Sequence, residues 1–387
     1  MKKLIGILSG LLMAFNSFAQ IEYSELSLNT ITTAVPFLLI APDSRSGAMG
    51  DVGVATSPDA NSMHWNPAKL AFTSEDIGAS ISYVPWLRAL VPDINLSYIT
   101  GYKKLDDNQA VGLEMRYFSL GDITFTDIVG TTIGQYKPHE FALGGSYARK
   151  LSDQFSLAIS ARYIYSNLTG GQSAGGIETV AGQSIASDLA GFYTKPVRMG
   201  GQDMDLAVGL NISNIGSKVS YTETSIRDFI PINMRLGTAL GADIDDYNKI
   251  SLAIDMNKLL VPTPPITDNG EIVSGKDSDV GVVSGIFQSF GDAPGGYKEE
   301  FREINYSVGS EYWYNDQFAI RAGYFFEHDT KGGRKFFTFG SGVKYSAFIL
   351  DFSYLVNAST DAGATNPLAN TMRFSMTWNF GAMKEMN

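Results

Sequence analysis

The chain has 387 residues, of which 40 are glycine and none is cysteine, and its formal charge of −11 argues against a nucleic-acid partner, which needs a basic footprint. The longest apolar run after the first residues, AVPFLLIA at 34–41, is far shorter than the ~20 residues that a membrane-spanning helix needs, which excludes a helical membrane protein. A membrane β-barrel is not excluded, because its apolar residues alternate with polar ones along each strand.

Residues 1–19 have the three parts of a secretory signal peptide. Two lysines at positions 2 and 3 precede an apolar stretch over 4–15, and Ser-Phe-Ala at 17–19 forms a cleavage site with small residues at both ends. Cleavage there would make Gln20 the mature N-terminus, and the absence of cysteine excludes a lipoprotein anchor. A buried N-terminal helix is the alternative interpretation.

Residues 20–75 follow no strand pattern, and we expect them to form an N-terminal periplasmic hatch that plugs a barrel. Within SPDANSMHWNPAKLAF (57–72), Ser-Pro at 57–58 and Asn-Pro at 66–67 are typical helix starts, because Ser and Asn cap helices and Pro fits the first turn. The apolar run at 37–40 favours burial over the alternative, a loose tether on the periplasmic rim.

Residues 76–380 repeat one pattern, in which segments of about ten residues alternate apolar and polar side chains between turn residues. The pattern predicts an all-β fold, a transmembrane antiparallel β-barrel of about 14 strands, which is an even number as in bacterial outer-membrane barrels. The predicted strands are 77–85, 94–102, 111–119, 141–149, 155–165, 187–195, 206–213, 232–240, 250–257, 304–312, 318–326, 336–345, 348–356 and 371–380.

Tight and long connections alternate between these strands. LSDQ at 151–154 is tight and 258–303 is long, while PVRMGGQD at 196–203 is the loosest of the tight set. Short periplasmic turns and long outer loops are typical of outer-membrane barrels, so both chain ends are expected in the periplasm, with 381–387 as a C-terminal tail. A soluble β-sandwich also has many alternating strands, but it would not explain this alternation of connections.

The charged residues within the predicted strands take the phase opposite to the apolar ones. We therefore expect the apolar face to meet lipid, where a charge costs about 2–4 kcal/mol near the midplane, and the charged face to line the lumen. Because both signs occur, they favour a cross-linked polar interior over an open pore. The predicted lumen residues are Glu114, Arg116, Arg162, Arg235, Asp255, Glu311, Arg321, Lys344, Asp351 and Arg373.

Three predicted outer loops carry apolar side chains that contact with water alone would not require. One interpretation is that the loops pack on one another and close the barrel mouth, and the other is a docking surface for another protein. In the longest loop the apolar positions, with Val283, follow helical spacing. The candidate binding residues are Trp86, Leu87, Leu90, Val91, Phe125, Ile128, Ile286, Phe287 and Phe290.

Little in the sequence indicates catalysis or metal binding. The three histidines, His64, His139 and His328, lack metal-ligand spacing and cysteine is absent, so we expect neither a metal nor another cofactor. No GxSxG motif is present, and the chain is not expected to be an enzyme, although a catalytic triad can assemble in space. A barrel enzyme that modifies lipid A therefore stays as a third hypothesis.

Two sets of residues resemble known families. Asn66-Pro67-Ala68, preceded by GAMGDVGVATSPDAN, resembles the N-terminal hatch of the FadL-like outer-membrane family. VPWLRALVPDINLSYITGYKKL (84–105), RYFSLGDITFTD (116–127) and SNIGSKVSY (213–221) resemble the PorV family of the type IX secretion system of Bacteroidota. With the signal peptide, the hatch and the strand count, the resemblance covers essentially the whole chain.

The resemblance implies a barrel of about fourteen strands in the bacterial outer membrane, in contact with membrane lipid and lipopolysaccharide, that is not an enzyme. PorV-like proteins collect cargo at the translocon SprA through the cargo's C-terminal signal domain. They deliver it to the attachment complex, where the sortase-like PorU removes that domain. The expected function is that of a carrier and adaptor, and the alternative is a transporter of hydrophobic small molecules, as in other FadL-like proteins.

Overall fold

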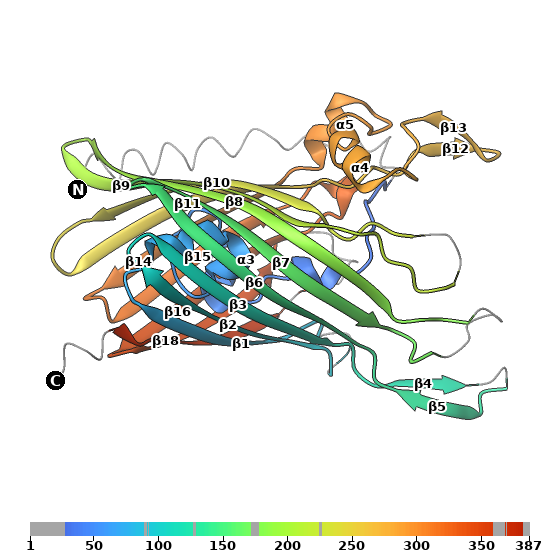
Figure 1. Cartoon of the computed structure of the whole chain (residues 1–387), viewed down its shortest axis with the longest axis horizontal. Coiled ribbons are helices and arrows are strands. Elements are labelled where there is room, and N and C mark those ends of the chain that lie inside the picture. Colours follow the sequence, from blue (N-terminus) through green and yellow to red (C-terminus); the bar gives the residue numbers. More distant parts are fainter. Residues whose placement is uncertain are drawn as a thin grey trace.

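The structure is a computed structural model that describes residues 28–88, 91, 93–126, 129–171, 178–223, 227–358, 368 and 370–381. Its main feature is a closed antiparallel barrel, with helical segments from the start of the chain inside it (Figure 1). The predicted signal peptide, Leu90, Ile128 and residues 382–387 lie outside the described residues. Within the described part of the chain, no helix is long and apolar enough to cross a membrane.

The barrel has 14 strands, as the alternation predicts. Each strand pairs with its neighbours in chain order, and the first closes on the last through a register from Gly78 opposite Asn379 to Tyr83 opposite Phe374. The strands are β1 (Ile77–Pro85), β2 (Asn95–Asp106), β3 (Gln109–Ser119), β6 (His139–Ser152), β7 (Phe155–Asn167), β8 (Gly182–Met199), β9 (Gln202–Gly216), β10 (Asn233–Asp243), β11 (Asn248–Leu259), β14 (Asn305–Tyr314), β15 (Phe318–Phe326), β16 (Lys335–Tyr345), β17 (Phe348–Asn357) and β18 (Met372–Asn379).

The alternation of side chains separates the two faces of the wall. In β7, Ser156, Ser160 and Arg162 point inward and are buried, whereas Leu157 and Ile159 point outward with 46% and 54% of their surfaces exposed. Successive side chains of a strand lie on opposite faces, so one apolar–polar alternation gives a lipid face and a polar lumen face.

The connections are tight at one end of the barrel and long at the other. The loosest predicted turn is in fact tight, because β8 continues to Met199 and β9 begins at Gln202. Only Gly200 and Gly201 lie between them, with φ of 62° and 87°, a conformation that glycine adopts without steric cost. By the rule for outer-membrane barrels, the long connections face outward, and we call that end the outer end.

Several long connections contain secondary structure of their own. The second outer loop forms a hairpin of β4 (Ile123–Thr126) and β5 (Thr132–Tyr136). The connection from β11 to β14 contains the hairpin of β12 (Ile266–Asp268) and β13 (Glu271–Ser274), and the helices α4 (Val282–Gln288) and α5 (Tyr297–Arg302). The helical spacing seen in the sequence corresponds to α4, which lies with α5 at the outer end beyond the wall (Figure 1). The connection from β15 to β16 includes η4 (Asp329–Lys331).

Residues 28–72 fill the barrel as a plug, built from η2 (Pro36–Leu39), α2 (Ser44–Gly47), α3 (Ser62–Trp65) and η3 (Pro67–Phe72). The helix expected at 57–58 does not form there, since α3 begins only at Ser62, whereas η3 begins at Pro67 as predicted. The plug is not confined to the periplasmic end. The Asn29 N–H donates to the Thr330 carbonyl (3.1 Å) in an outer connection, so the described chain starts at the outer mouth and runs inward.

The core lies between the plug and the wall. Toward the turn end, plug residues such as Met49, Val54 and Leu70 pack on a wall lined with alanines, including Ala148 and Ala253. Short wall side chains leave the space that the plug occupies. A second cluster toward the outer end joins Phe37 and Leu38 of the plug to larger wall residues.

Candidate functional site

The hatch motif sits where the plug meets the wall. The buried Asn66 donates from Nδ2 to the carbonyls of Val54 and Gly191 (3.0 Å each), and its Oδ1 accepts from the Ala68 N–H (3.1 Å). Pro67 is the first residue of η3, where a missing N–H has no consequence. One asparagine therefore caps η3, fixes a plug turn and attaches both to β8.

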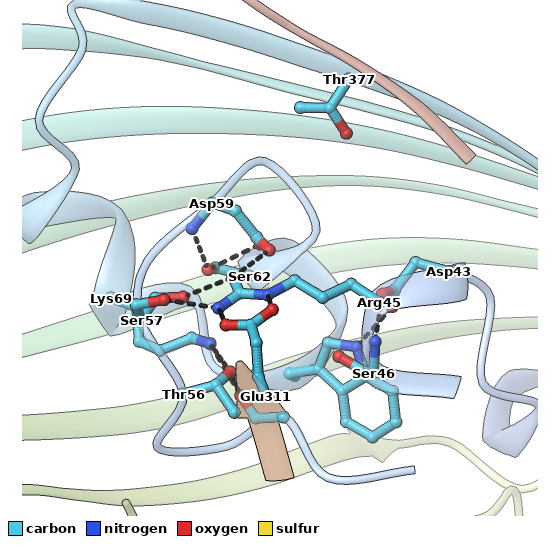
Figure 2. A network of polar contacts seen from close by, with 12 residues as sticks. Asp43, Arg45, Ser46, Thr56, Ser57, Asp59, Ser62, Lys69, Glu311 and Thr377 are labelled. Carbon is cyan, nitrogen blue, oxygen red and sulfur yellow. Dashed lines mark hydrogen bonds and ion pairs between the residues drawn. The ribbon is translucent and has the colours of Figure 1, made fainter. Parts of the chain in front are cut away.

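Arg45 ties the plug to β14 (Figure 2). Its Nε and Nη2 lie 3.0 and 2.8 Å from the two carboxylate oxygens of Glu311, and its Nη1 lies 2.9 Å from Asp59. Arg321 donates to Glu311 (2.7 Å) and to Asp351 (2.6 Å), which extends the chain of charges along the wall. This bidentate geometry orients the guanidinium and carboxylate planes and gives a stronger contact than a single hydrogen bond.

Arg162 is the centre of a second buried cluster. It contacts Glu114 at 2.6 Å and Asp188 at 3.0 Å, and the Tyr98 hydroxyl donates to Glu114 at 2.7 Å. Asp188 was missed by the sequence analysis, although it lies on the lumen face of a predicted strand. Its position in the apolar–polar alternation could have identified Asp188 as a lumen residue. The predicted strand 187–195 was the least clear of the series, however, and Asp188 lies next to its first residue.

His64 of the plug lies between two arginines. Arg116 Nη2 is 2.7 Å from His64 Nδ1, and Arg235 Nη2 is 3.4 Å from His64 Nε2. Arg116 also donates to the Leu38 carbonyl (2.8 Å), so it joins two parts of the plug. In contrast to Arg162, the hydrogen-bond partners of these two arginines within the described residues are neutral groups.

Two further predicted lumen residues bind plug backbone. Asp255 Oδ2 accepts from the successive N–H groups of residues 53–54 (2.8 and 3.0 Å). Arg373 donates to the Gly47 carbonyl (3.3 Å) and lies 3.3 Å from Asp51. Five of these wall positions thus contact the plug directly. Of the other four, Arg321 and Asp351 extend the Glu311 cluster, and Glu114 and Arg162 pair with each other. Their shared property is burial: Glu114, Arg116, Arg162, Arg235, Asp255, Glu311, Arg321, Asp351 and Arg373 each have 8% or less of their surface exposed.

The remaining polar candidates do not join this network. Lys344 is exposed near the end of β16. His139 stacks on Tyr117 with ring centroids 6.0 Å apart, and His328 accepts from the Thr330 N–H. Across the described residues, no three His, Cys, Asp or Glu side chains gather as metal ligands would.

The apolar loop residues divide into packed and exposed ones. Trp86 and Leu87 are half-buried against the outer-end cluster that contains Phe325, Phe336 and Leu355. Phe125 on β4 is also half-buried. In the first loop, Trp86 and Leu87 therefore pack on the outer end of the wall and are not fully exposed.

Exposed apolar side chains occur instead on α4, just after it and on α5, and we call this set the α4–α5 apolar face. On α4, Phe287 is 74% exposed while Ile286 packs down on the barrel rim. The sequence analysis missed the members on α5, although their spacing of four residues places them on one side of a helix. The α4–α5 apolar face consists of Val283, Phe287, Phe290, Tyr297 and Phe301.

Ion pairs fasten this connection to β11 and to η4, and a hydrogen bond joins it to the start of the plug. Lys258 contacts Glu300 and Glu303 at 3.1 and 2.6 Å, and Lys331 contacts Glu299 and Glu303 at 2.6 and 2.9 Å. Asn29 Nδ2 donates to Glu299 (3.0 Å). Burial raises the pKa of Glu299, but the Lys331 contact outweighs it, so this pKa lies below its ordinary value and the carboxylate is ionised.

These features define a class of protein: an outer-membrane β-barrel whose lumen is occupied by its own N-terminal segment and whose outer end carries an exposed apolar face. The family model described as "Type IX secretion system protein PorV" matches residues 23–266, and the chain belongs to this family. It is therefore an outer-membrane protein of the type IX secretion system. No curated protein matches the chain.

Similar solved structures include FadL-like outer-membrane barrels. The Pseudomonas putida toluene transporter TodX is 13% identical, covers 87% of this chain and 97% of its own, and has a TM-score of 0.49. The Ralstonia pickettii toluene transporter TbuX is 12% identical over 91% of this chain and 97% of its own, with a TM-score of 0.43. A Pseudomonas aeruginosa FadL homologue is 11% identical over 92% and 100%, with a TM-score of 0.45. These identities are too low to indicate a shared ligand.

Proposed function

We propose that the chain is a carrier and adaptor, which collects secreted proteins at the translocon by their C-terminal signal domain and delivers them to the surface attachment complex. The observation that carries the proposal is the α4–α5 apolar face, at the outer end of a barrel whose lumen holds the plug. Large aromatic side chains grouped on a rigid surface are typical of protein-binding sites.

The filled lumen supports a function at the outer surface. Buried ion pairs such as Arg45 with Glu311 cross from plug to wall, and breaking them by removing one partner costs about 3–5 kcal/mol each. Passage through the lumen would require several such contacts to open together. Docking on the outer loops requires none of them to open.

We assign each candidate partner to a part of the outer surface according to the exposure of the apolar side chains there. The connection from β11 to β14 is proposed to bind the translocon SprA through the α4–α5 apolar face. Cargo is proposed to contact the other outer loops, where Val91 is 38% exposed and Ile123 is 41% exposed. Trp86 and Leu87 contribute less than expected, because they are half-buried in the mouth. Delivery to the sortase PorU completes the proposed cycle.

Affinity purification from detergent extracts tests the proposal. The variant Phe287→Ser with Phe301→Ser removes two exposed aromatics, each worth about 2 kcal/mol or more if it is an interface hot spot. The matched control, Ile272→Ser with Val273→Ser, changes two exposed apolar residues of the same connection outside the helices. We expect translocon and cargo to co-purify with wild type and control, and translocon to be lost from the aromatic variant. Co-purification that is equal in all three, or absent in all three, contradicts the proposal.

The alternative function, transport of hydrophobic small molecules, requires an apolar path through the barrel. The charged clusters around Arg45 and Arg162 occupy the lumen, and they do not favour such a path. Uptake of a labelled fatty acid by cells with and without the protein distinguishes the two functions. Uptake that depends on the protein would support the transporter.

A further inference from the structure

A chamber of about 430 Å³ lies between the plug and the outer loops. Trp65 of the plug, with Arg235 and Asn257 of the wall, lines it from within the barrel. On the outer side it is lined by residues 30–33, part of the segment 28–35 that we call the strap, and by the connection from β15 to β16. Residues 30 and 32 and Gly332 are exposed, so the chamber opens at the outer rim. Its volume lies in the range of about 300–1,000 Å³ that is usual for ligand pockets.

Arg235 is a buried cation in this chamber without a carboxylate partner among the described residues. Its Nη1 donates to the His64 carbonyl at 3.3 Å and its Nη2 lies 3.4 Å from His64 Nε2. With the Asn233 side-chain amide turned over, which satisfies both of its ends, the Arg235 Nε also donates to the Asn233 amide oxygen at 3.2 Å. All three contacts are long and none neutralises the charge. Guanidinium groups that bind carboxylates do so with two parallel, shorter hydrogen bonds. The site therefore has an unmet preference for an anion.

The acidic side chains that line the chamber do not meet this preference, because each is paired with another cation. Within the described residues none of these carboxylates forms an ion pair with Arg235, and the cation beside each one offsets its charge. These pairs are Asp51 with Arg373 (3.3 Å), Glu303 with Lys331 (2.9 Å) and Glu327 with Arg334 (2.7 Å).

The same chamber offers groups that match a peptide backbone. Asn257 Oδ1 is buried and has no hydrogen-bond partner among the residues that the structure describes, so it can accept from a donor. In the strap, residues 30–33 make no backbone hydrogen bond to another described residue, whereas Asn29 and Ala34 on either side do. A stretch of unpaired backbone beside an extended peptide can pair with it, as in recognition by strand addition. Backbone groups of the strap and the Asn257 side-chain oxygen thus lie around Arg235 and can accept or donate hydrogen bonds.

We propose that this chamber binds the C-terminal end of a cargo polypeptide, with the terminal carboxylate on Arg235 and a peptide N–H on Asn257. The inference rests on the proposed function, since it names the part of the cargo that the carrier holds. A free inorganic anion would use Arg235 but would leave Asn257 and the strap unpaired. A hydrophobic ligand would leave all three unpaired, and buried polar groups without partners cost free energy. A peptide terminus alone supplies an anion and backbone donors together.

Calorimetry on the purified full-length protein in detergent tests the proposal. The probe is the recombinant C-terminal signal domain of a secreted protein from the same cell. It is prepared by intein chemistry in two forms, one with a free terminal carboxylate and one with a carboxamide. A hydrogen bond to a charged group is worth about 1.5–3 kcal/mol, so we expect the carboxylate form to bind about tenfold to a hundredfold more tightly.

Two variants distinguish an effect of the chamber on binding from an effect of lumen charge in general. Arg235→Gln should reduce binding of the carboxylate form to that of the carboxamide form. Arg116→Gln is the matched control, because Arg116 also contacts His64 and has no carboxylate partner within the described chain but does not line the chamber. This control should keep the discrimination. Should Arg235→Gln fail to fold, Asn257→Leu removes the Oδ1 acceptor, and it should weaken both forms about two- to tenfold by removing one neutral hydrogen bond.

Each result has a distinct meaning. Equal affinity for the two forms overturns the chamber proposal and leaves the carrier function intact. Loss of discrimination in Arg116→Gln also overturns it, because the effect would then belong to lumen charge in general. If neither form binds the wild-type protein, both the carrier function and the chamber proposal are wrong.

Discussion

The fit of the plug against the wall can be tested at one glycine. Gly309 and Gly323 lie opposite each other on β14 and β15, directly beneath Met49 of the plug. A Cβ added to Gly323 would lie 2.0 Å from the Met49 carbonyl carbon and 2.1 Å from the Gly50 nitrogen, against about 3.4 Å for ordinary contact. Because both atoms belong to backbone, rotation of a side chain cannot relieve the overlap. We therefore expect Gly323→Ala to displace the plug.

The expected magnitude follows from the size of the overlap. Overpacking typically costs about 1–3 kcal/mol, and a backbone overlap of this depth belongs at the upper end. A cost of about 3 kcal/mol would raise the population of the displaced plug about a hundredfold, since each ~1.4 kcal/mol is a factor of ten. Conductance in planar bilayers and proteolysis of the plug measure this population.

Gly241→Ala is the matched control for this experiment. Gly241 also faces the lumen from a strand, but a Cβ there would meet no atom within 4 Å. The substitution should leave conductance unchanged and can stabilise the fold slightly, by about 0.4–1 kcal/mol, because alanine restricts the unfolded chain. If Gly323→Ala behaves like Gly241→Ala in both assays, the backbone of Met49 and Gly50 does not lie against Gly323.

Three further predictions concern charge, depth and topology. Arg45→Ala should lower the free energy of unfolding in detergent by about 3 kcal/mol, because it leaves buried carboxylates unpaired. Arg45→Lys should cause a smaller loss. Equal stability of the wild type and both variants would refute a stabilising role for the ion pair of Arg45 with Glu311. Leu113→Arg, in the middle of the lipid face, should lower the free energy of unfolding by about 2–4 kcal/mol. Leu105→Arg, near the turn end, should lower it by only about 0–1 kcal/mol. Urea unfolding measures both losses, and the reverse order would contradict the assigned position of the membrane. The chain has no cysteine, so a single introduced thiol can be labelled selectively. Leu28→Cys, at the outer end, should react with a membrane-impermeant maleimide on intact cells, whereas Asp153→Cys, at the turn end, should react only after lysis. Labelling of Asp153→Cys on intact cells would show that the barrel has the opposite orientation.

The strands were predictable because lipid and lumen impose a period of two on every one of them. Positions such as Glu114 and Arg373 could be placed on the lumen face from phase alone, and the structure buries both. The tight turn at Gly200 and Gly201 was read as loose, because two glycines in a polar stretch indicate either a turn or a flexible loop. Similarly, Tyr297 was overlooked because a helix of one and a half turns gives little periodic signal.

The sequence by itself determined that the chain forms a membrane barrel, which side of each strand meets lipid, and which family it belongs to by resemblance. Tertiary structure decided how the lumen is filled. The plug enters from the outer end, Arg45 pairs with Glu311 across 266 positions of sequence, and Arg235 has no carboxylate partner among the described residues. Such pairings depend on where the plug lies against the closed wall, and a local pattern carries no information on contacts between segments so far apart.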